Sequence, residues 1–463
     1  MRNLNRAFFY ILIIIVILGL SCARKPISRQ PNVILIVTDD QGSLDLNSYG
    51  SDDLITPNLD KLATRGVRFT QFYAGSALCS PSRASLLTGQ TPQRAGLPRN
   101  AESRPQHFGK HGGLPDSAFT LAELFKGAQY RTGHFGKWHL GFSPGPNEQG
   151  FDRSVGFMGG CIDQWGHFNW GGAPWGVPPR RHDLYEDGKE VWRSGQHLGD
   201  IAVGEAISFI KEAPESPFFV YLAFALPHYP LQPYDRHKIT YAHLPEPRRT
   251  YAAMITTIDD QIGRLLQAVD DLGITKETIV IFQSDHGHAT DARANYGGGN
   301  SGPYRGAKSS LFEGGIRVPA IISWPDSLPQ NVVRDQLAVS ADWFATLADY
   351  CGIPLKPAQI DGRSLRSAIA SAENSSPHSQ WIWQLSSQVA IRQGAWKLLL
   401  HPRDTSDGTK KRRKLSGPFL VNLEDDISEK RNLAAQFPEK VTALTEVYQK
   451  WRSGLPTAPR KQD

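Results

Sequence analysis

The sequence predicts an α/β fold with a mostly parallel central sheet flanked by helices, followed by a smaller C-terminal subdomain with a short antiparallel sheet and a helix. Three continuous apolar runs, at residues 32–37, 217–225 and 278–282, are rich in β-branched and aromatic residues, as strands buried on both faces are. Helical periodicity separates them, most clearly at 251–272. Beyond residue 380 the apolar runs are short, and 438–451 is the last predicted helix. A chain of 463 residues, 40% hydrophobic and 21% charged, is large enough for one large domain and a smaller one.

The N-terminus has the pattern of an export signal. Arg2 and Arg6 precede an apolar stretch at residues 7–20 that is short for a transmembrane helix. Cys22 follows Gly-Leu-Ser, which resembles the lipobox of bacterial lipoproteins, although Gly19 replaces the usual branched residue. We therefore expect residues 1–22 to direct export to the periplasm or cell surface, with Cys22 as a lipid anchor. The alternative, an uncleaved membrane anchor, also places the rest of the chain outside the cytoplasm.

Acidic and histidine side chains follow the predicted strands. Asp39 and Asp40 come directly after the run at 32–37, His228 follows the run at 217–225, and Asp285 follows the run at 278–282. Ligand sites of open α/β sheets lie at the carboxyl ends of the strands, so we expect these side chains to meet at one edge. Carboxylate oxygens suit a hard divalent cation, which makes this edge a candidate metal site.

Two further segments lead toward the same edge. Thr56 and Pro57 predict the capped start of a helix that ends at Gly66, and residues 67–73 alternate as a strand. Residues 130–135 predict another strand, and Lys137 and His139 after it point the same way in an extended segment.

Cys79 lies just before a predicted helix start. Pro81 suits the first turn of a helix, and Gly89 can take the left-handed conformation that ends one. Cys79 and Arg83 are four residues apart and share one face, near the positive end of the helix dipole. The pattern predicts an anion-binding position; the plain alternative is a buried cysteine beside a surface arginine.

The string Cys-Ser-Pro-Ser-Arg at 79–83, followed by Leu-Thr-Gly at 87–89, resembles the signature of the type I sulfatases. Further blocks agree with that family in the same order: Thr-Pro-Asn-Leu-Asp at 56–60, Gly-Lys-Trp-His at 136–139, Pro-His at 227–228 and Gly-x-Lys-x-x-x-x-Glu-Gly-Gly at 306–315. The resemblance runs from about residue 32 to the C-terminal helix. It implies an alkaline-phosphatase-like sandwich and a sulfatase activity.

The resemblance also implies two cofactors. In the family a maturation system oxidises the cysteine to formylglycine, whose hydrate is the nucleophile, and here that cysteine is Cys79. Asp39, Asp40 and Asp285 would hold Ca²⁺ together with the modified Cys79. The family most often has Asn where this chain has His286, so His286 is a further candidate ligand that departs from the pattern.

Each remaining matched residue receives a role from the family. Lys137 and Lys308 would contact the sulfate, and Arg83 would hold the formylglycine hydrate. His139 would transfer protons at the formylglycine hydroxyl, and His228 would protonate the leaving oxygen.

Several polar features outside these motifs have plainer interpretations. We expect Glu313 and Arg317 to form a structural ion pair, because the Gly and Pro residues beside them indicate a tightly turned backbone. Asp259 and Asp260, within a helical stretch, are expected to be solvated. The basic run at 410–414 fits a solvated hairpin better than a nucleic-acid site, and contact with a sulfated polymer is an open alternative.

Two questions stay open from the sequence. The irregular segment at 141–196 carries four tryptophans that could stack on sugar rings or pack within a loop: Trp165, Trp170, Trp175 and Trp192. Cys161 and Cys351 could form a disulfide or remain free thiols.

The sequence thus predicts five segments: an export signal at 1–22, a tether at 23–31, a catalytic domain at 32–370, a linker at 371–379 and a C-terminal subdomain at 380–463. The net charge of +6 is compatible with an anionic substrate, but a plain surface property would explain it equally well. We expect hydrolysis of sulfate esters on a sulfated carbohydrate, a polysaccharide or glycosaminoglycan fragment, with no nucleic-acid partner. The alternatives are a phosphomonoester or phosphonate hydrolase on the same scaffold, and a silent sulfated-glycan binder in which Cys79 stays a thiol.

Overall fold

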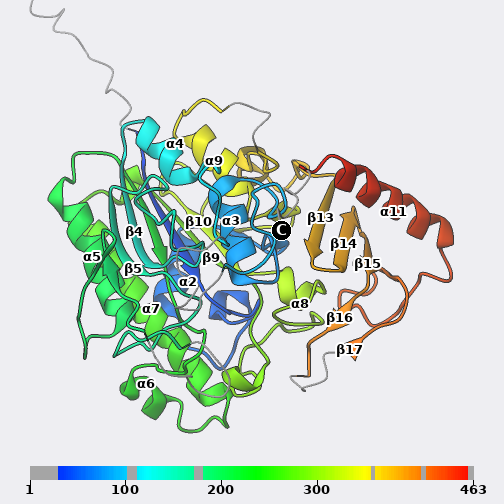
Figure 1. Cartoon of the computed structure of the whole chain (residues 1–463), viewed down its shortest axis with the longest axis horizontal. Coiled ribbons are helices and arrows are strands. Elements are labelled where there is room, and N and C mark those ends of the chain that lie inside the picture. The colour runs from blue at the N-terminus through cyan, green and yellow to red at the C-terminus, as the bar shows by residue number, and fades with distance from the viewer. Residues whose placement is uncertain (1–29, 102–111, 171–180, 356–359, 408–412, 457–463) are drawn as a thin grey trace, which may run out of the picture. The chain divides into compact units, whose positions relative to one another are not determined.

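The computed structural model describes residues 30–101, 112–170, 181–355, 360–407 and 413–456 (Figure 1). The described residues from Pro31 onward belong to one compact unit. The expected export signal, with Cys22, lies outside the described residues. Within those ranges, no helix is long and apolar enough to cross a bilayer.

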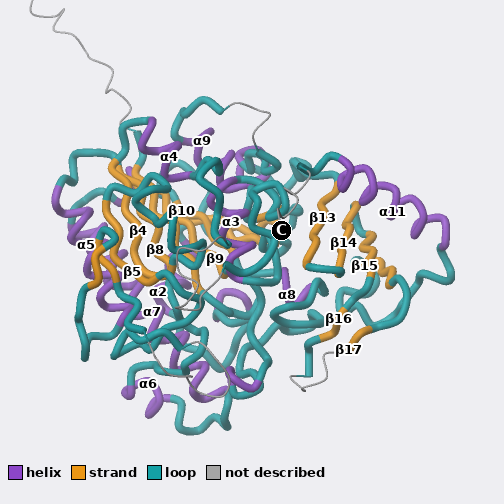
Figure 2. Tube along the Cα trace, in the orientation of Figure 1, coloured by secondary structure: helices purple, strands orange, loops and turns teal. Residues whose placement is uncertain are grey.

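The central sheet has ten strands in the order β11-β2-β10-β9-β1-β8-β4-β5-β6-β7. They are β1 (Asn32–Thr38), β2 (Gly66–Phe69), β4 (Arg131–Lys137), β5 (Arg153–Phe157), β6 (Tyr185–Glu186), β7 (Lys189–Glu190), β8 (Phe218–Ala223), β9 (Thr278–Ser284), β10 (Ala320–Ser323) and β11 (Val332–Arg334). The middle strands β9, β1, β8, β4 and β5 are parallel, whereas β10, β6 and β7 run antiparallel to their neighbours. The expected mostly parallel sheet is confirmed, and Figure 2 shows its central strands side by side in orange.

Helices cover both faces of this sheet, because alternate residues of each central strand point to opposite sides. In β1, Val33, Leu35 and Val37 pack with helices on one face, and Ile34 and Ile36 pack with helices on the other. The first face carries α3 (Cys79–Thr88), α4 (Leu121–Gly127) and α9 (Asp342–Tyr350). The second carries α2 (Pro57–Thr64), α5 (Leu198–Glu212) and α7 (Arg248–Asp271).

The other described helices before the C-terminal sheet are short. They are α6 (Asp235–Thr240), α8 (Glu313–Ile316) and α10 (Arg366–Ala370), with 3-10 turns at Asn47–Tyr49, Thr275–Glu277 and Ala292–Ala294.

The predicted C-terminal subdomain forms a second sheet. Strands β13 (Gln380–Leu385), β14 (Gln388–Gln393), β15 (Trp396–Leu400) and β18 (Phe419–Asn422) are antiparallel in that order. One face packs through Trp383 and Leu399 against Phe312 of the larger domain, and the other is covered by α11 (Pro438–Ser453) through Leu444. Figure 1 shows α11 along the outer side of this sheet.

Residues 67–73 do not form the single strand that their alternation predicts. The segment breaks after β2, and β3 (Phe72–Tyr73) pairs with β12 (Ala338–Val339) in a separate sheet. The break comes at Thr70, whose N–H donates to the carbonyl of Arg334. The chain thereby leaves the main sheet just before it reaches Cys79.

The expectation that Asp259 is solvated is wrong. Thr56 occupies the N-cap position of α2, as expected, but its side chain makes no capping hydrogen bond. Asp259 is fully buried, and its carboxylate accepts hydrogen bonds from the backbone N–H groups of Asn58 (3.1 Å) and Leu59 (2.8 Å). The Thr56 side chain instead donates to Asn47 and Asp60. A carboxylate from α7 thus satisfies the free donors at the start of α2. Asp260 is partly exposed, as expected.

Three smaller expectations are settled. The predicted ion pair exists, since Arg317 donates to Glu313 at 3.1 Å. Cys161 and Cys351 are both free thiols. β16 (Arg403–Asp404) pairs antiparallel with β17 (Arg413–Lys414), so the end of the basic run belongs to a hairpin.

Candidate active site

The carboxyl ends of the parallel strands bring the predicted polar residues together. Asp39 and Asp40 follow β1, His228 follows β8 in the next position of the sheet, and Asp285 follows β9 on the other side. Lys137 ends β4. Asp40 has a positive φ of 65°, a conformation that Asp tolerates better than most residues, and its carboxylate lies close to that of Asp39.

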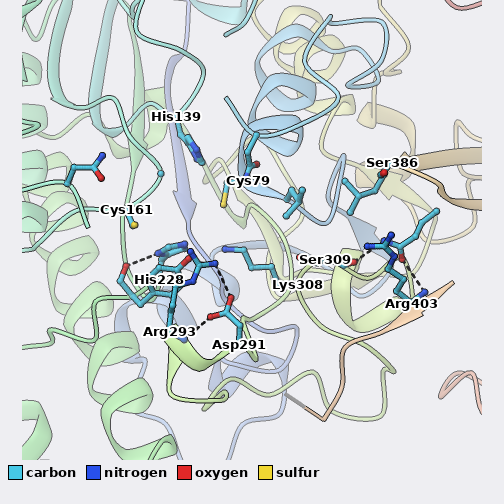
Figure 3. Close-up of a pocket in the computed structure, with 17 residues that line it drawn as sticks. Cys79, His139, Cys161, His228, Asp291, Arg293, Lys308, Ser309, Ser386 and Arg403 are labelled. Carbon is cyan, nitrogen blue, oxygen red and sulfur yellow. Dashed lines mark hydrogen bonds and ion pairs between the residues drawn. The ribbon is translucent and has the colours of Figure 1, made fainter. Parts of the chain in front are cut away.

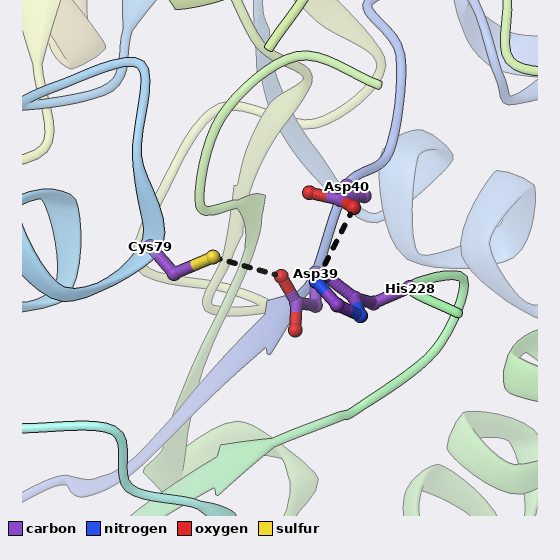
Figure 4. A group of neighbouring side chains, drawn as sticks. All are labelled: Asp39, Asp40, Cys79 and His228. Atoms are coloured by element: carbon purple, nitrogen blue, oxygen red, sulfur yellow. Dashed lines mark hydrogen bonds and ion pairs between the residues drawn. The ribbon is translucent and has the colours of Figure 1, made fainter. Parts of the chain in front are cut away.

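Cys79 is the first residue of α3 and is 1% exposed. Its Sγ lies 3.6 Å from Oδ1 of Asp39 (Figure 4). The same sulfur lies 3.2 Å from Nε2 of His286. The helix ends at Gly89 with a φ of 67°, as the sequence predicts. The sulfur is therefore held at a helix N-terminus beside a carboxylate and an imidazole.

Arg83 lies one turn further along α3 and is completely buried. Its Nε and Nη2 atoms donate to Oδ2 of Asp285 at 3.1 and 3.0 Å, and Nη2 is 4.0 Å from Oδ2 of Asp39. Arg83 therefore fixes the Asp285 carboxylate beneath Cys79.

Two lysines pair with the two carboxylates of β1. Lys137 Nζ is 2.5 Å from Oδ2 of Asp39, and Lys308 Nζ is 2.6 Å from Oδ1 of Asp40. Lys308 lies on the wall of a cavity that Cys79 also lines. Positive charge thus flanks the sulfur on two sides.

These charges shift the ionisation of their neighbours. Burial opposes ionisation of Cys79, but Lys137 and Lys308 outweigh it and lower the pKa of the thiol to about 6. Burial likewise opposes the charged form of His286, yet Asp285 and Cys79 raise its pKa to about 9. Burial raises the pKa of Asp40 to about 7 against the opposing charge of Lys308. The Asp39 carboxyl, although buried, keeps a pKa well below its ordinary value because Lys137 lies against it.

Two histidines complete the site. Nδ1 of His228 donates to the carbonyl of Tyr229 at 2.7 Å, and Nε2 lies 3.7 Å from Oδ2 of Asp40. Burial first, and then Lys308, holds the pKa of His228 well below its ordinary value. His139 has a φ of 52°, and burial followed by Lys137 lowers its pKa in the same way.

One cavity of about 370 Å³ connects these groups. Cys79, His139, His228 and Lys308 all line it, and Figure 3 shows their side chains directed toward one space. Asp39, Asp40, Arg83, Lys137, Asp285 and His286 lie behind this wall and are buried. The cavity therefore presents a nucleophile position, two imidazoles and an ammonium group to a ligand.

The same atoms form two possible metal-ligand sets. Asp39, Asp40, Cys79 and His228 offer one set, and Asp39, Cys79, Asp285 and His286 the other, with ligand atoms within 4.8 Å of one another in each. Oδ2 of Asp40 is buried and accepts no hydrogen bond from any described residue. Three converging carboxylates with an unused oxygen fit a hard divalent cation.

Other wall residues had no signal in the sequence. The cavity is also lined by Asp291 and Arg293, from the loop after β9, and by Leu385, Ser386, Gln388 and Arg403, from the C-terminal sheet and hairpin. They belong to no recognisable motif, and only the packing of the two sheets brings the second group to the site.

The described tryptophans of the 141–196 segment are not among the residues that line this cavity. Trp192 is 62% exposed and stacks on His182 with ring centroids 3.8 Å apart, and Trp165 is 39% exposed. Trp170 packs beside Tyr229 and Ala289. Trp175 lies outside the described residues.

Comparison with known proteins gives a consistent result. The family model described as Sulfatase matches residues 31–353. The N-acetylgalactosamine-6-sulfatase of Canis lupus familiaris is 36% identical over 380 residues, which cover 78% of this chain and 69% of that protein. Arylsulfatase A of Homo sapiens is 32% identical over 462 residues, which cover 91% of this chain and 87% of that protein.

Solved structures agree with the sequence relatives. The crystal structure of Ps i-CgsB in complex with k-i-k-neocarrahexaose superposes with a TM-score of 0.79 at 31% identity, covering 91% of this chain and 93% of that one. The phosphonate monoester hydrolase of Agrobacterium radiobacter, at 21% identity, has a TM-score of 0.63 over 92% of this chain and 96% of its own, and shares the fold.

Proposed function

This chain belongs to the sulfatase family and is a sulfuric ester hydrolase, and we propose that it removes sulfate from a sulfated carbohydrate. The observation that carries the proposal is the position of Cys79, at the start of α3, inside a ring of buried charges and on the wall of the 370 Å³ cavity. We further propose that a maturation system converts Cys79 to formylglycine, whose hydrated form supplies the attacking oxygen.

A divalent cation, Ca²⁺ in this proposal, fits the carboxylates behind Cys79. Asp39, Asp40 and Asp285 would hold it together with the modified Cys79, and His286 is a further candidate because its Nε2 lies 3.2 Å from Sγ. When bound, the cation would neutralise sulfate oxygens and lower the pKa of the attacking hydroxyl.

The charged side chains of this chain would bind and orient the sulfate. Sulfate esters resist attack because their oxygens are negative, so the site has to offset that charge. Lys308 presents its ammonium group at the cavity wall, and Lys137 adds a second buried charge beside Cys79. Arg83 would fix the position of the Asp285 carboxylate through two hydrogen bonds, and thereby help to fix the position of the nucleophile.

The two histidines would move protons on the two sides of the sulfate. His228 donates from Nδ1 to the Tyr229 carbonyl, so Nε2 is the atom that can exchange a proton with the leaving oxygen. A bound sulfate would add negative charge beside His228 and raise its low pKa, which the role of acid requires. His139 lines the same cavity and would take a proton from the hydroxyl at position 79.

The carbohydrate class is supported by the names of relatives and by the cavity. One relative acts on N-acetylgalactosamine 6-sulfate by its name, and a structural neighbour is bound to k-i-k-neocarrahexaose. The cavity of about 370 Å³ is large enough for a sugar with its sulfate group.

We also propose the division of the chain that the sequence predicts. Residues 32–370 would form the catalytic domain, 371–379 the linker and 380–463 the C-terminal subdomain. Residues 1–22 would direct export, with a lipid anchor at Cys22 and a tether at 23–31. Because residues 1–22 would direct export, we propose no nucleic-acid partner.

The activity is tested with protein produced together with a formylglycine-generating enzyme. We expect turnover of 4-nitrophenyl sulfate to exceed that of 4-nitrophenyl phosphate, and sulfate release from at least one member of a panel of defined sulfated saccharides. Phosphate hydrolysis that dominates by orders of magnitude would replace the proposal with a phosphomonoester or phosphonate hydrolase. Saccharide binding without turnover, with an intact Cys79 thiol, would indicate a silent binder.

A further inference from the structure

The cavity has a second wall that comes from the C-terminal sheet. β13 contributes Leu385, the turn after it contributes Ser386, β14 contributes Gln388, and β16 contributes Arg403. Figure 3 shows Arg403 and Arg293 on opposite sides of Lys308. A ligand whose sulfate lies at Cys79 and Lys308 is therefore flanked by two arginines.

The two arginines differ in how their charge is balanced. Arg293 pairs with Asp291 at 3.3 Å and lies over the ring of Tyr229. No described carboxylate lies within ion-pair distance of the Arg403 guanidinium. Its neighbour Asp404 points to the other side of the strand and pairs with Arg305 at 2.7 Å. Arg403 therefore has an uncompensated positive charge to offer a ligand.

The backbone of Arg403 is fixed relative to Lys308. Gln388 donates from Nε2 to the carbonyl of Ser309, the residue after Lys308, at 3.0 Å, and accepts at Oε1 from the N–H of Arg403 at 3.3 Å. The hydroxyl of Ser310 donates to the carbonyl of Arg403 at 2.7 Å. These hydrogen bonds hold the backbones near Lys308 and Arg403 in a fixed arrangement. Such an arrangement favours a ligand whose two anionic groups have a matching separation.

A groove of about 650 Å³ lies beyond the β13–β14 turn, and Ser386 lines both it and the cavity. Two arginines, Arg99 and Arg452, line the groove, and none of its described lining residues is acidic. Arg452 donates to the side chain of Gln384 at 3.1 Å. A chain of sugars could therefore continue from the cavity past Ser386 over a basic surface.

We propose that the substrate is an oligosaccharide with a second anionic group near the hydrolysed sulfate ester, that Arg403 binds this second group, and that the chain continues past Ser386 into the groove. This inference rests on the proposed function and specifies its substrate. The second group can be a sulfate or a uronic acid carboxylate, since both match the guanidinium.

The test is a comparison of three disaccharides that share the same scissile sulfate ester. One has no other charge, one has a second sulfate on the adjoining sugar, and one has a carboxylate there. For Arg403→Gln we expect kcat/KM to fall about tenfold with a doubly charged disaccharide, mainly through KM, and less than about twofold with the singly charged one, because a charge-assisted hydrogen bond is lost only in the first case. Arg403→Lys should recover part of the loss.

The matched control is Arg366→Gln, which removes an exposed arginine that pairs with Asp349 and does not line the cavity. It should leave all three kcat/KM values within experimental error of the wild type. Thermal unfolding of each variant should show no loss of fold. The second group is identified by the disaccharide, with sulfate or with carboxylate, for which Arg403→Gln lowers kcat/KM more.

Affinity gives a readout that does not depend on turnover. In a Cys79→Ala background, titration calorimetry with the preferred disaccharide should show about tenfold weaker binding when Arg403→Gln is added. Adding Arg452→Gln should weaken binding of the corresponding tetrasaccharide further. It should leave binding of the disaccharide unchanged.

The inference would be overturned if Arg403→Gln changed kcat/KM equally for singly and doubly charged disaccharides, or changed it for neither. In that case the proposed function would still stand as long as the wild type releases sulfate. A wild type that turns over 4-nitrophenyl sulfate but no saccharide would remove the carbohydrate assignment and this inference together.

Discussion

This molecule has two clusters of buried charge that are built from similar residues. They differ in whether any of their members lines the cavity. We call the first the active-site cluster: Asp39, Asp40, Cys79, Arg83, Lys137, Asp285, His286 and Lys308. The second, the junction cluster, consists of Glu313, Arg317, Lys397 and Glu429 and joins the C-terminal sheet to the larger domain. All members of both are buried except Lys308, which lies at the cavity wall.

The junction cluster is closed on itself. Glu313 accepts hydrogen bonds from Tyr73 (2.6 Å), Arg317 (3.1 Å) and Lys397 (2.8 Å), and its N–H donates to Glu429 at 2.6 Å. Lys397 also pairs with Glu429 at 2.9 Å. Each charge in this cluster lies within ion-pair distance of an opposite charge of the same cluster, and no member lines the cavity, so we assign the cluster the role of holding the two sheets together.

The active-site cluster is open. Cys79 and Lys308 face the cavity, and Oδ2 of Asp40 has no hydrogen-bond donor among the described residues. The difference shows that buried charge alone does not indicate a catalytic site. What distinguishes the active-site cluster is that two of its members, Cys79 and Lys308, line a space that a substrate can enter.

The largest effect should follow removal of the nucleophile. Cys79→Ala should lower sulfate release by more than about 10⁴-fold, because no other side chain supplies the attacking oxygen. Rates with 4-nitrophenyl sulfate and circular dichroism measure activity and fold. Cys351→Ala, which removes a buried free thiol that does not line the cavity, is the matched control and should keep its activity. Retained turnover in Cys79→Ala would assign the chemistry elsewhere.

Breaking the junction cluster should act on stability instead. Lys397→Met leaves Glu313 and Glu429 buried without the ammonium group between them, and we expect a loss of about 3–5 kcal/mol in the free energy of unfolding. Urea denaturation measures it. Lys430→Met, at an exposed position, should change stability by less than about 0.5 kcal/mol. A Lys397→Met protein as stable as the wild type would show that the cluster does not hold the sheets together.

Removal of the cation should affect both activity and stability. EGTA should abolish sulfate release and lower the melting temperature by about 3 °C, a modest shift because Lys137 and Lys308 already offset part of the carboxylate charge. Asp40→Asn keeps a side chain that tolerates the positive φ and should lose the calcium-dependent shift. Asp260→Asn, on the surface of α7, should retain it. Melting curves that are identical with calcium and with EGTA would argue against a cation at this site.

The smallest effect concerns the pH dependence of stability. Burial, with a further contribution from Glu313, raises the pKa of Glu429 from 4.5 to about 7 against the charge of Lys397. The folded state therefore holds this proton more tightly than the unfolded state. The resulting stabilisation is complete below about pH 4.5 and is lost as the pH rises through about 7.

Glu429→Gln should flatten this pH dependence by on the order of 2 kcal/mol between pH 5 and pH 8. Urea denaturation at several pH values measures it, with Glu424→Gln, an exposed change, as control. If the free energy of unfolding of Glu429→Gln changed with pH as steeply as that of the wild type, Glu429 would not be the group that takes up this proton.

The contrast between the clusters also explains what the sequence predicts well. Asp39, His228 and Asp285 follow recognisable apolar strands, and parallel strands bring their carboxyl ends to one edge, so local patterns locate most of the active-site cluster. The conformation of Cys79 and Gly89 follows from local helix rules in the same way.

Contacts between distant segments could not be predicted. Lys397 meets Glu313 across 84 positions of sequence, and Asp259 meets Leu59 across 200. Arg403 reaches the cavity only because the C-terminal sheet packs against the larger domain. None of these residues has a local pattern that separates it from a surface charge, since their partners are set by tertiary packing.

The most direct test of the central claim is the mass of the tryptic peptide that spans residues 69–83, from protein produced in its natural host or with a formylglycine-generating enzyme. We predict a peptide lighter than its unmodified form by the mass of H₂S less one oxygen, and we expect the fraction of this lighter peptide to rise in proportion to the sulfatase activity of the preparation. An active preparation in which this peptide carries only an unmodified Cys79 thiol would contradict the account.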